Sequence, residues 1–453
     1  MDTSIVVVAL PTLLHDLGAS LLHGVWIITG YRLALTILLV AIGRVADMFG
    51  RVRLYVLGFA FFTFSSALCG LSQSGDQLVF FRMLQGVGGA LIIVNSVALI
   101  ADAFPPSQLG TGIGMNFMAF NFGAIIGYTL SGVIVALAGW RYIFLINIPI
   151  GVFGTFWAYI RLKELHPTVR ESFDYLGALL YSASLTLILA GLSFEDLNSP
   201  LTVILLGAGV ILLPLFIIVE KRVAHPTLDL ALFKIRLFTA GNLASLLNSL
   251  AFNAQPFLLT LYFQLVRGED PLSTGLLLIP LEVTFLIFGP LSGRLSDIYG
   301  ARGLSSLGLL LSGAALLWLG NVDAGTDYTT ITLILIASGV GRGLFTSPNS
   351  SSIMSSVPAH RRGVANGVRT TIVQTGIVAS IPLSLAFMTL GMPYARLTQL
   401  TGGTSPMTPQ DIPKFLTAIH HAFNILAVLT FSAILPSILR GPKPNLDSLD
   451  KAS

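Results

Sequence analysis

Charged residues are scarce in this chain of 453 residues. Only 10% are Asp, Glu, Lys or Arg, while 54% are hydrophobic, whereas roughly a quarter of the residues of a soluble domain are charged. The alternating segments of about ten residues that a membrane barrel requires are also missing, and apolar runs of about twenty residues take their place. In lipid every backbone amide needs an internal partner. The sequence therefore predicts an all-α polytopic membrane protein and excludes a barrel.

Cysteine is nearly absent as well. The single Cys69 excludes a disulfide framework within one chain and any multi-cysteine metal site. The seven histidines have no ligand spacing that pairs them with acids or with the cysteine, so we expect no metal site. No G-x-x-x-x-G-K-[ST] phosphate loop occurs, which argues against ATP-driven transport. No catalytic constellation is found, so we predict neither an enzyme nor a bound cofactor.

Long apolar runs are what the chain has in abundance. Runs bounded by charges and turns predict fourteen membrane spans, near residues 1–12, 24–43, 53–71, 77–101, 110–136, 142–160, 175–193, 201–219, 238–264, 272–291, 303–320, 329–352, 365–390 and 414–437. The first run, up to Pro11, gives about 15 Å of helix against a hydrocarbon core of about 30 Å. Either translation begins upstream of Met1, or the fold tolerates a truncated first helix. A cleaved signal peptide fits less well, because no basic segment precedes the run.

Lys and Arg are distributed unevenly between alternate loops. If the loop at 43–53 is cytoplasmic, the inner loops and the tail hold 17 of the 25 Lys and Arg residues, and the outer loops hold four. This asymmetry predicts a multi-pass protein of the plasma membrane with both termini in the cytoplasm. It also explains the net charge of +4 without nucleic acid as a partner.

Two similar loops indicate an internal repeat. Residues 43–53 read GRVADMFGRVR and residues 293–302 read GRLSDIYGAR. A series of glycines from Gly86 to Gly123 recurs from Gly339 to Gly376 at a constant offset of 253 residues. Parallel repeats of this kind are expected of a rocking-bundle transporter. We predict a six-helix bundle at 1–162, an extra helix pair with a linker at 163–236, a second six-helix bundle at 237–440 and a cytoplasmic tail at 441–453.

Five ordered motifs carry a family resemblance. They are DTSIVVVALP at 2–11, WIITGY at 26–31, the loop at 43–53, RMLQGVGGA at 82–90 and WRYIFLINIPIG at 140–151. In this order and at these spacings they resemble the major facilitator superfamily, and specifically its fourteen-span drug:proton antiporters of the EmrB/QacA type. The resemblance implies two six-helix bundles with two extra helices between them, and proton-coupled efflux of drugs.

One motif departs from that family. Its span-five pattern G-x-x-x-G-P-x-x-G-G is replaced by GAIIGYTLSG at 123–132, where Tyr128 stands in place of the proline and Ser131 in place of a glycine. The small residues Gly123, Gly127, Ser131 and Gly132 still predict a face for close helix packing. Without a proline the helix lacks a kink, so the mode of coupling stays open.

Charged residues inside spans are the best candidates for transport, because their burial in lipid is costly. The resemblance makes Arg82 a link between binding and conformational change, and Asp2 a site for a proton or a cationic drug. The alternatives are an arginine that snorkels to the interface and a solvated N-terminal aspartate. Arg32 favours an anion or an ion pair with Asp2, whether functional or structural. Glu282 is the alternative proton carrier, and Arg342 is expected to line the cavity.

The repeated loops supply a second group of candidates. The resemblance makes them a latch on the inner side, and the alternative is that their arginines only follow the positive-inside bias. The residues concerned are Gly43, Asp47, Gly50, Arg51, Gly293, Asp297 and Gly300.

The sequence thus predicts a secondary transporter that exports small amphipathic compounds in exchange for protons. Its expected partners are a small-molecule substrate, protons and membrane lipids, with no obligate protein partner. Two alternatives stay open: a uniporter or anion exporter without proton exchange, which Arg32 and the lost proline favour, and a membrane sensor or scaffold that transports nothing.

Overall fold

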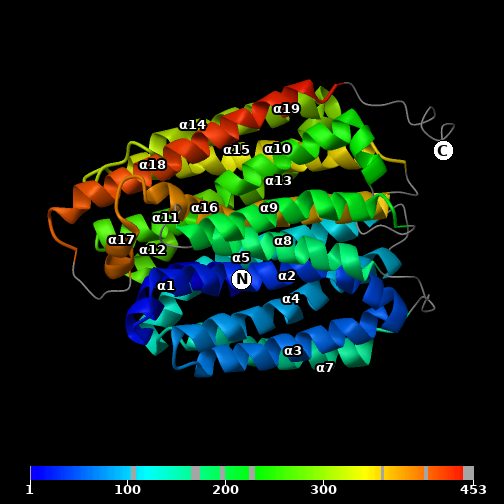
Figure 1. Cartoon of the computed structure of the whole chain (residues 1–453), viewed down its shortest axis with the longest axis horizontal. Coiled ribbons are helices and arrows are strands. Elements are labelled where there is room, and N and C mark those ends of the chain that lie inside the picture. Colours follow the sequence, from blue (N-terminus) through cyan, green and yellow to red (C-terminus); the bar gives the residue numbers. More distant parts are fainter. Residues whose placement is uncertain are drawn as a thin grey trace. The chain divides into compact units, whose positions relative to one another are not determined.

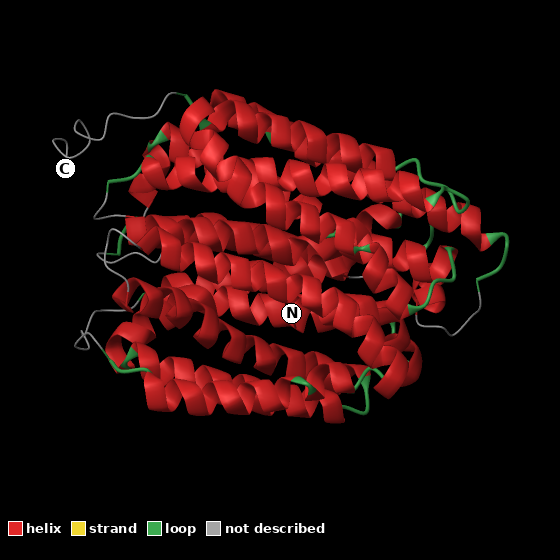
Figure 2. Cartoon of the chain, turned by 180° about the vertical axis from the view of Figure 1, so that it is seen from behind, coloured by secondary structure: helices red, strands yellow, loops and turns green. Residues whose placement is uncertain are grey.

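The computed structural model describes residues 2–103, 109–164, 174–193, 199–223, 230–358, 362–401 and 407–441. Within these ranges the chain is helical and no residue lies in a β-strand (Figure 2). Helices form because apolar runs that cannot hydrate their amides satisfy them internally. The prediction of an all-α protein is thereby confirmed.

Figure 1 labels the helices in chain order. The first nine are α1 (Asp2–Leu17), α2 (Leu21–Phe49), α3 (Arg51–Leu71), α4 (Gly75–Ala103), α5 (Leu109–Ala138), α6 (Tyr142–Leu145), α7 (Asn147–Arg161), α8 (Tyr175–Ser193) and α9 (Pro200–Glu220). They are followed by η1 (Leu230–Lys234), α10 (Arg236–Phe252), α11 (Gln255–Leu261), η2 (Tyr262–Val266), α12 (Pro271–Leu277), α13 (Ile279–Tyr299), α14 (Ala301–Leu319), α15 (Tyr328–Ser355), α16 (Arg362–Met388), α17 (Tyr394–Thr401), α18 (Asp411–Ser432) and α19 (Ile434–Leu439).

The predicted count of fourteen spans is not supported. Among the described residues, eleven helices are long and apolar enough to cross a membrane, and two shorter apolar stretches, Ser4–Leu17 and Phe122–Ala138, accompany them. The region predicted as one span at 238–264 is divided into α10, α11 and the π-helical η2. Its first part carries the buried amides of Asn242 and Asn248, which make it less apolar than an ordinary span.

The first helix extends further than the sequence indicated. Pro11 does not end it, because α1 continues to Leu17. Proline is tolerated inside membrane helices, where neighbouring groups satisfy the carbonyl that it leaves without a donor.

Contacts divide the chain into two compact units. Unit 1 comprises Met1–Phe216, Gly268–Leu276 and Ala395–Pro406. In it α4 packs against α2 and α3, α3 packs against α7, and α1 packs against α5 (Figure 1). A Cβ on Gly88 would overlap the backbone of Phe62, so α3 and α4 touch through their main chains.

Unit 2 comprises Ile217–Arg267, Leu277–Tyr394 and Met407–Ser453. In it α15 packs against α13 and α14, and α10 packs against α16 and α18. Gly308 and Gly341 face each other so closely that a Cβ on either would overlap the carbonyl oxygen of the other. Since Gly341 follows Gly88 by the offset of 253, the repeat places a close glycine contact at corresponding positions of both units.

The short helix α12 lies against α5 within unit 1. A Cβ on Gly132 would overlap the backbone of Leu272, and a Cβ on Gly275 would overlap the carbonyl of Tyr128. Asp270 caps the start of α12 by accepting hydrogen bonds from the backbone amides of Leu272 (2.7 Å) and Ser273 (2.9 Å). The bonds from Ser273 and the amide of Leu272 lower the pKa of this carboxyl, because they stabilise its charged form.

Candidate functional site

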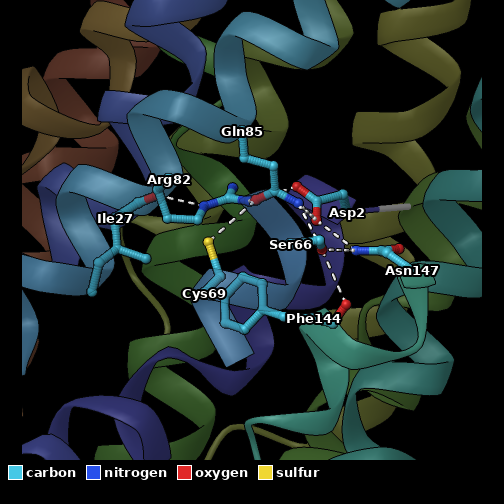
Figure 3. A network of polar contacts seen from close by, with 8 residues as sticks. All are labelled: Asp2, Ile27, Ser66, Cys69, Arg82, Gln85, Phe144 and Asn147. Carbon is cyan, nitrogen blue, oxygen red and sulfur yellow. Dashed lines mark hydrogen bonds and ion pairs between the residues drawn. The ribbon is translucent and has the colours of Figure 1, made fainter. Parts of the chain in front are cut away.

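A buried polar network joins four helices of unit 1 (Figure 3). Its centre is the guanidinium of Arg82, which lies on α4 and is fully buried. Gln85 follows it by one helical turn, so the two side chains share a face of α4. The Arg82 Nη1 atom donates to Gln85 Oε1 over 2.5 Å. One helix thus supplies both a positive charge and an amide to the same point.

The Asp2 carboxylate on α1 accepts bonds from three other side chains. Its Oδ2 atom accepts a hydrogen bond from Arg82 Nη1 at 2.6 Å, and the two groups form a salt bridge. Its Oδ1 atom accepts hydrogen bonds from Gln85 Nε2 at 3.0 Å and from Asn147 Nδ2 at 3.1 Å. The side chain of Asp2 is 11% exposed, so this is a charge pair almost withdrawn from solvent. The structure therefore brings together Asp2 and Arg82, the two residues to which the sequence assigned coupling.

Ser66 on α3 closes the network. Its hydroxyl accepts from Gln85 Nε2 and Asn147 Nδ2, both at 3.0 Å, and donates to the carbonyl of Phe144 at 3.0 Å. Ser66 and Gln85 are fully buried and Asn147 is nearly so. The buried thiol of Cys69 lies 3.7 Å from Gln85 Oε1. The network therefore ties α1, α3, α4 and the start of α7 to one another.

Arg82 also has partners that carry no charge. Its Nε atom donates to the carbonyl of Ile27 at 3.0 Å, and its guanidinium lies 4.4 Å from the ring centroid of Tyr31 and 5.7 Å from that of Phe144. Its Nη2 atom has no hydrogen-bond partner among the described residues. These contacts exclude a snorkelling arginine at the interface, because the side chain does not reach water.

Unit 2 contains a smaller charged cluster. Arg342 Nη1 on α15 lies 3.5 Å from Glu282 Oε1 on α13. The guanidinium lies 4.2 Å from the ring centroid of Phe285 and 4.8 Å from that of Phe252. Its side chain is 24% exposed, whereas that of Glu282 is 6% exposed. This pair is longer and more accessible than the pair in unit 1, so a ligand can reach the arginine more easily.

The repeat relates further residues of the two units. At the offset of 253, Asp2 corresponds to Gln255 and Gln85 corresponds to Ser338. Ser338 donates to Gln255 Oε1 at 2.8 Å, so both units join these two positions by a hydrogen bond. In unit 2 the carboxylate is replaced by an amide, and this pair is neutral.

The repeated loops contain sharp turns. Gly50, between α2 and α3, has φ 103°, and Gly300, between α13 and α14, has φ 82°, a region in which glycine is favoured. Gly293 lies against Ser347 so closely that a Cβ would come within 2.8 Å of its hydroxyl. Gly43 and Asp47 lie on α2, Arg51 begins α3, and Asp297 lies on α13. Their role as a latch stays a prediction.

The sequence did not single out Glu164, which touches the first of these loops. Its Oε1 atom accepts from the backbone amides of Val52 at 2.9 Å and Arg53 at 3.2 Å. A carboxylate at the start of α3 is favoured by the helix dipole. Glu164 therefore ties the chain that leaves α7 to the loop between α2 and α3.

The small residues of α5 make close contacts. The Ser131 hydroxyl donates to the carbonyl of Ile5 on α1 at 2.5 Å, and Gly132 lies against α12. Gly127 is buried and Gly123 is half-buried.

The remaining predicted site residue, Arg32, is half-buried on α2, directly after Tyr31. Among the described residues, no group of three His, Cys, Asp or Glu side chains is placed to hold a metal ion.

Gln85, Ser66 and Asn147 were not predicted as site residues. The spacing of Gln85 from Arg82 was the available signal, since residues three apart on a helix are neighbours. Asn147 lies within one of the sequence motifs, but nothing in the sequence shows that it reaches α1. Ser66 carries no signal, because a serine in an apolar helix is common.

Comparison with known proteins gives a consistent result. The sequence profile described as "Major Facilitator Superfamily" matches residues 1–381 and again residues 241–435. The riboflavin transporter RibZ of Clostridioides difficile is 30% identical over 379 residues, which are 82% of this chain and 81% of the relative. The tetracenomycin C resistance and export protein of Streptomyces glaucescens is 31% identical over 383 residues, 83% of this chain and 71% of the relative. Multidrug resistance protein 3 of Bacillus subtilis is 27% identical over 387 residues, 84% of this chain and 75% of the relative.

Solved structures show the same fold. A bacterial homologue of the human lysosomal transporter Spinster, in an inward-facing and unoccupied conformation, has a TM-score of 0.69 at 15% identity and covers 97% of this chain and 93% of its own. The human organic anion transporter MFSD10 has a TM-score of 0.61 at 14% identity, with 97% of each chain covered.

Proposed function

This chain belongs to the Major Facilitator Superfamily, and on that premise we propose that it exports small amphipathic compounds in exchange for protons by alternating access. It is a transporter and not an enzyme. We further propose that it belongs to the drug:proton antiporter branch of the superfamily and that it resides in the plasma membrane with both termini in the cytoplasm.

The observation that carries the proposal is the buried salt bridge between Asp2 and Arg82. A carboxylate in this position has two states that differ in charge, and only the ionised state balances the arginine. Protonation of Asp2 would leave the guanidinium buried without a counter-ion, which costs about 3–5 kcal/mol. Binding of a proton at Asp2 therefore favours a conformation in which Arg82 finds another partner.

The size of this effect is suited to a conformational switch. Moving an equilibrium from 1:99 to 99:1 takes about 5.5 kcal/mol. Loss of the salt bridge supplies more than half of that, and a substrate that interacts with one conformation alone supplies the rest. Because α1, α3, α4 and α7 all contribute to the network, a change at Asp2 reaches each of them.

Glu282 is the second proposed proton site. It is the acidic partner of Arg342, and the flanking rings of Phe252 and Phe285 provide an apolar and aromatic surface beside the charge. Such a surface suits an amphipathic compound, because it binds an apolar body and a polar group at once. We propose that Arg342 contacts substrate and that Glu282 competes with substrate for it.

The relatives support the direction of transport. One is named as a resistance and export protein and another as a multidrug resistance protein. A third is named as a riboflavin transporter. We therefore propose small organic molecules as the substrate class and export as the direction.

The test is proton flux in proteoliposomes across a panel of compounds. Wild-type protein should acidify or alkalinise the lumen when a transported compound is added, in step with movement of that compound. Asp2→Asn should transport without the proton, or not at all, and Glu282→Gln should reduce coupling. Asp16→Asn, an exposed carboxylate on the same helix as Asp2, is the matched control and should behave as wild type.

The outcomes separate the alternatives. If both Asp2→Asn and Glu282→Gln stay fully coupled, neither residue carries the proton. If compounds move without any proton in wild-type protein, the chain is a uniporter or an anion exporter, as the partly exposed Arg342 and the half-buried Arg32 would favour. If no compound moves under an imposed pH gradient and none binds, transport itself is refuted, and a sensor or scaffold is the better explanation.

A further inference from the structure

Three arginines gather at one end of unit 2. Arg236 begins α10, Arg302 lies in the first turn of α14, and Arg440 follows the last residue of α19. The helix α19 packs against both α10 and α14. Among the described residues, none of the three forms an ion pair with a carboxylate.

One hydrogen bond fixes the geometry of two of them. The hydroxyls of Ser306 on α14 and Ser437 on α19 lie 3.0 Å apart. Arg302 precedes Ser306 by four residues, which is one helical turn on the same face, and Arg440 follows Ser437 by three. Each arginine lies about one turn from the point where the two helices touch, and the charge of Arg302 acts on Arg440, so the two lie at the same end.

Arg440 is buried but incompletely satisfied. It is only 2% exposed. Its Nε atom donates to the carbonyl of Ser437 at 2.8 Å and its Nη2 atom to the Ser437 hydroxyl at 2.7 Å, while Nη1 has no partner among the described residues. Burial and the nearby charge of Arg302 lower the pKa of Arg440 to about 10. A buried cation next to a second cation is costly unless an anion joins them.

Arg236 and the start of α14 complete the cluster. Arg236 Nε donates to the carbonyl of Leu439 at 2.8 Å, which holds its guanidinium beside the end of α19. The N-terminus of α14 has no side-chain cap, so its first amides are open to a ligand. Gly303 in this turn has no atom near the position of a Cβ, so the backbone there is open to approach.

We propose that these three arginines and the first turn of α14 bind a phosphate group. Guanidinium groups match the oxygens of phosphate geometrically and carry the opposite charge. Helix N-termini favour anions for the same electrostatic reason. In the predicted orientation this end faces the cytoplasm, where the headgroup of an anionic phospholipid and free phosphate are the two available sources.

Binding to purified protein in detergent, measured by native mass spectrometry, tests the site. The probes are phosphatidylglycerol, phosphatidylcholine and inorganic phosphate, each titrated against wild type, Arg302→Gln and the double variant Arg302→Gln/Arg440→Gln. Arg222→Gln removes an exposed arginine at the end of α9 and is the matched control. Because Arg302 is exposed, its substitution keeps the proposal testable even if the buried Arg440 is needed for folding.

We expect phosphatidylglycerol to bind wild type and the control equally, about fivefold more weakly to Arg302→Gln, and not detectably to the double variant. Binding of inorganic phosphate, with competition against the lipid, would identify free phosphate as a ligand. Binding of phosphatidylglycerol alone would identify the headgroup. The proposal is overturned if neither probe binds, or if Arg302→Gln and Arg222→Gln bind phosphatidylglycerol alike. Transport activity plays no part in this readout, so the result is independent of the proposed function.

Discussion

Removal of the Asp2 charge should destabilise the protein more than removal of both charges of its salt bridge. In Asp2→Asn the amide oxygen can still accept from Gln85 and Asn147, but its NH₂ group faces the Arg82 Nη1 donor at the 2.6 Å contact. Removing one partner of a buried pair costs about 3–5 kcal/mol. Because Arg82 keeps its bonds to Ile27 and Gln85, we expect a loss near the lower end, about 3 kcal/mol.

The double variant Asp2→Asn/Arg82→Gln leaves no unpaired charge behind. Replacing a whole buried ion pair by well-packed apolar residues of similar volume is often close to neutral in stability, and the Asn and Gln side chains likewise leave no charge buried. The double variant should therefore recover at least half of the loss. At about 2 °C per kcal/mol, Asp2→Asn should melt about 6 °C below wild type, with the double variant between them.

The chain contains its own reporter for this measurement. Cys69 is the single cysteine, is fully buried and lies 3.7 Å from Gln85. A thiol-reactive dye that fluoresces on reaction will therefore label it only when this part of unit 1 opens. The reasoning is refuted if Asp2→Asn melts with wild type, or if the double variant melts below Asp2→Asn. Asp16→Asn should not differ from wild type.

Three further predictions concern other parts of the chain. Gly132→Leu should destabilise the α5–α12 contact by about 1–3 kcal/mol, seen as earlier labelling in the same dye assay, whereas Gly289→Ala has open space around it and should melt as wild type. Arg342→Lys loses the planar stacking on the rings of Phe252 and Phe285, so the apparent substrate affinity in transport should fall by between about twofold and about thirtyfold. An unchanged affinity would contradict a contact between Arg342 and substrate. Asp270→Ala should lower the free energy of unfolding by about 1 kcal/mol at most. Because the pKa of Asp270 is lowered in the folded state, this difference from wild type should persist above pH 5 and shrink only as the pH falls below about 4. A difference that grows on acidification would contradict the cap.

The sequence predicted the class of fold and its repeat better than the details of single helices. Apolar runs identify helices because lipid forbids unsatisfied amides, and the offset of 253 correctly related Gly88 to Gly341, whose close contacts recur in the two units. It failed at residues 238–264, where one apolar run is divided into α10, α11 and a π-helical turn. A run of hydrophobic residues shows that a segment is buried, but not whether its helix is continuous.

The site was predicted in part, and for a physical reason. Charges inside apolar spans are rare enough to stand out, so Asp2, Arg82, Glu282 and Arg342 were chosen as candidates, and the structure pairs them. Neutral polar residues do not stand out, because serine and asparagine occur throughout membrane helices as packing groups. Asn349 illustrates this, since it ties α15 to α10 by bonds to Gly241 and Ser245 and not to any charged group. Which serine or asparagine meets Asp2 depends on tertiary contacts that one sequence does not encode visibly.

The two units of the repeat differ chemically at one corresponding position, which is Asp2 in unit 1 and Gln255 in unit 2. Each of the two positions is joined by a hydrogen bond to the residue that directly precedes the glycine series, Gln85 on α4 or Ser338 on α15. A carboxylate can exchange a proton, whereas an amide cannot. A proton taken up here would therefore change the charge at this position in unit 1 and leave its counterpart in unit 2 as it was. Under the proposed proton exchange, a proton gradient would thus act at this position on one unit of the repeated fold and not on the other.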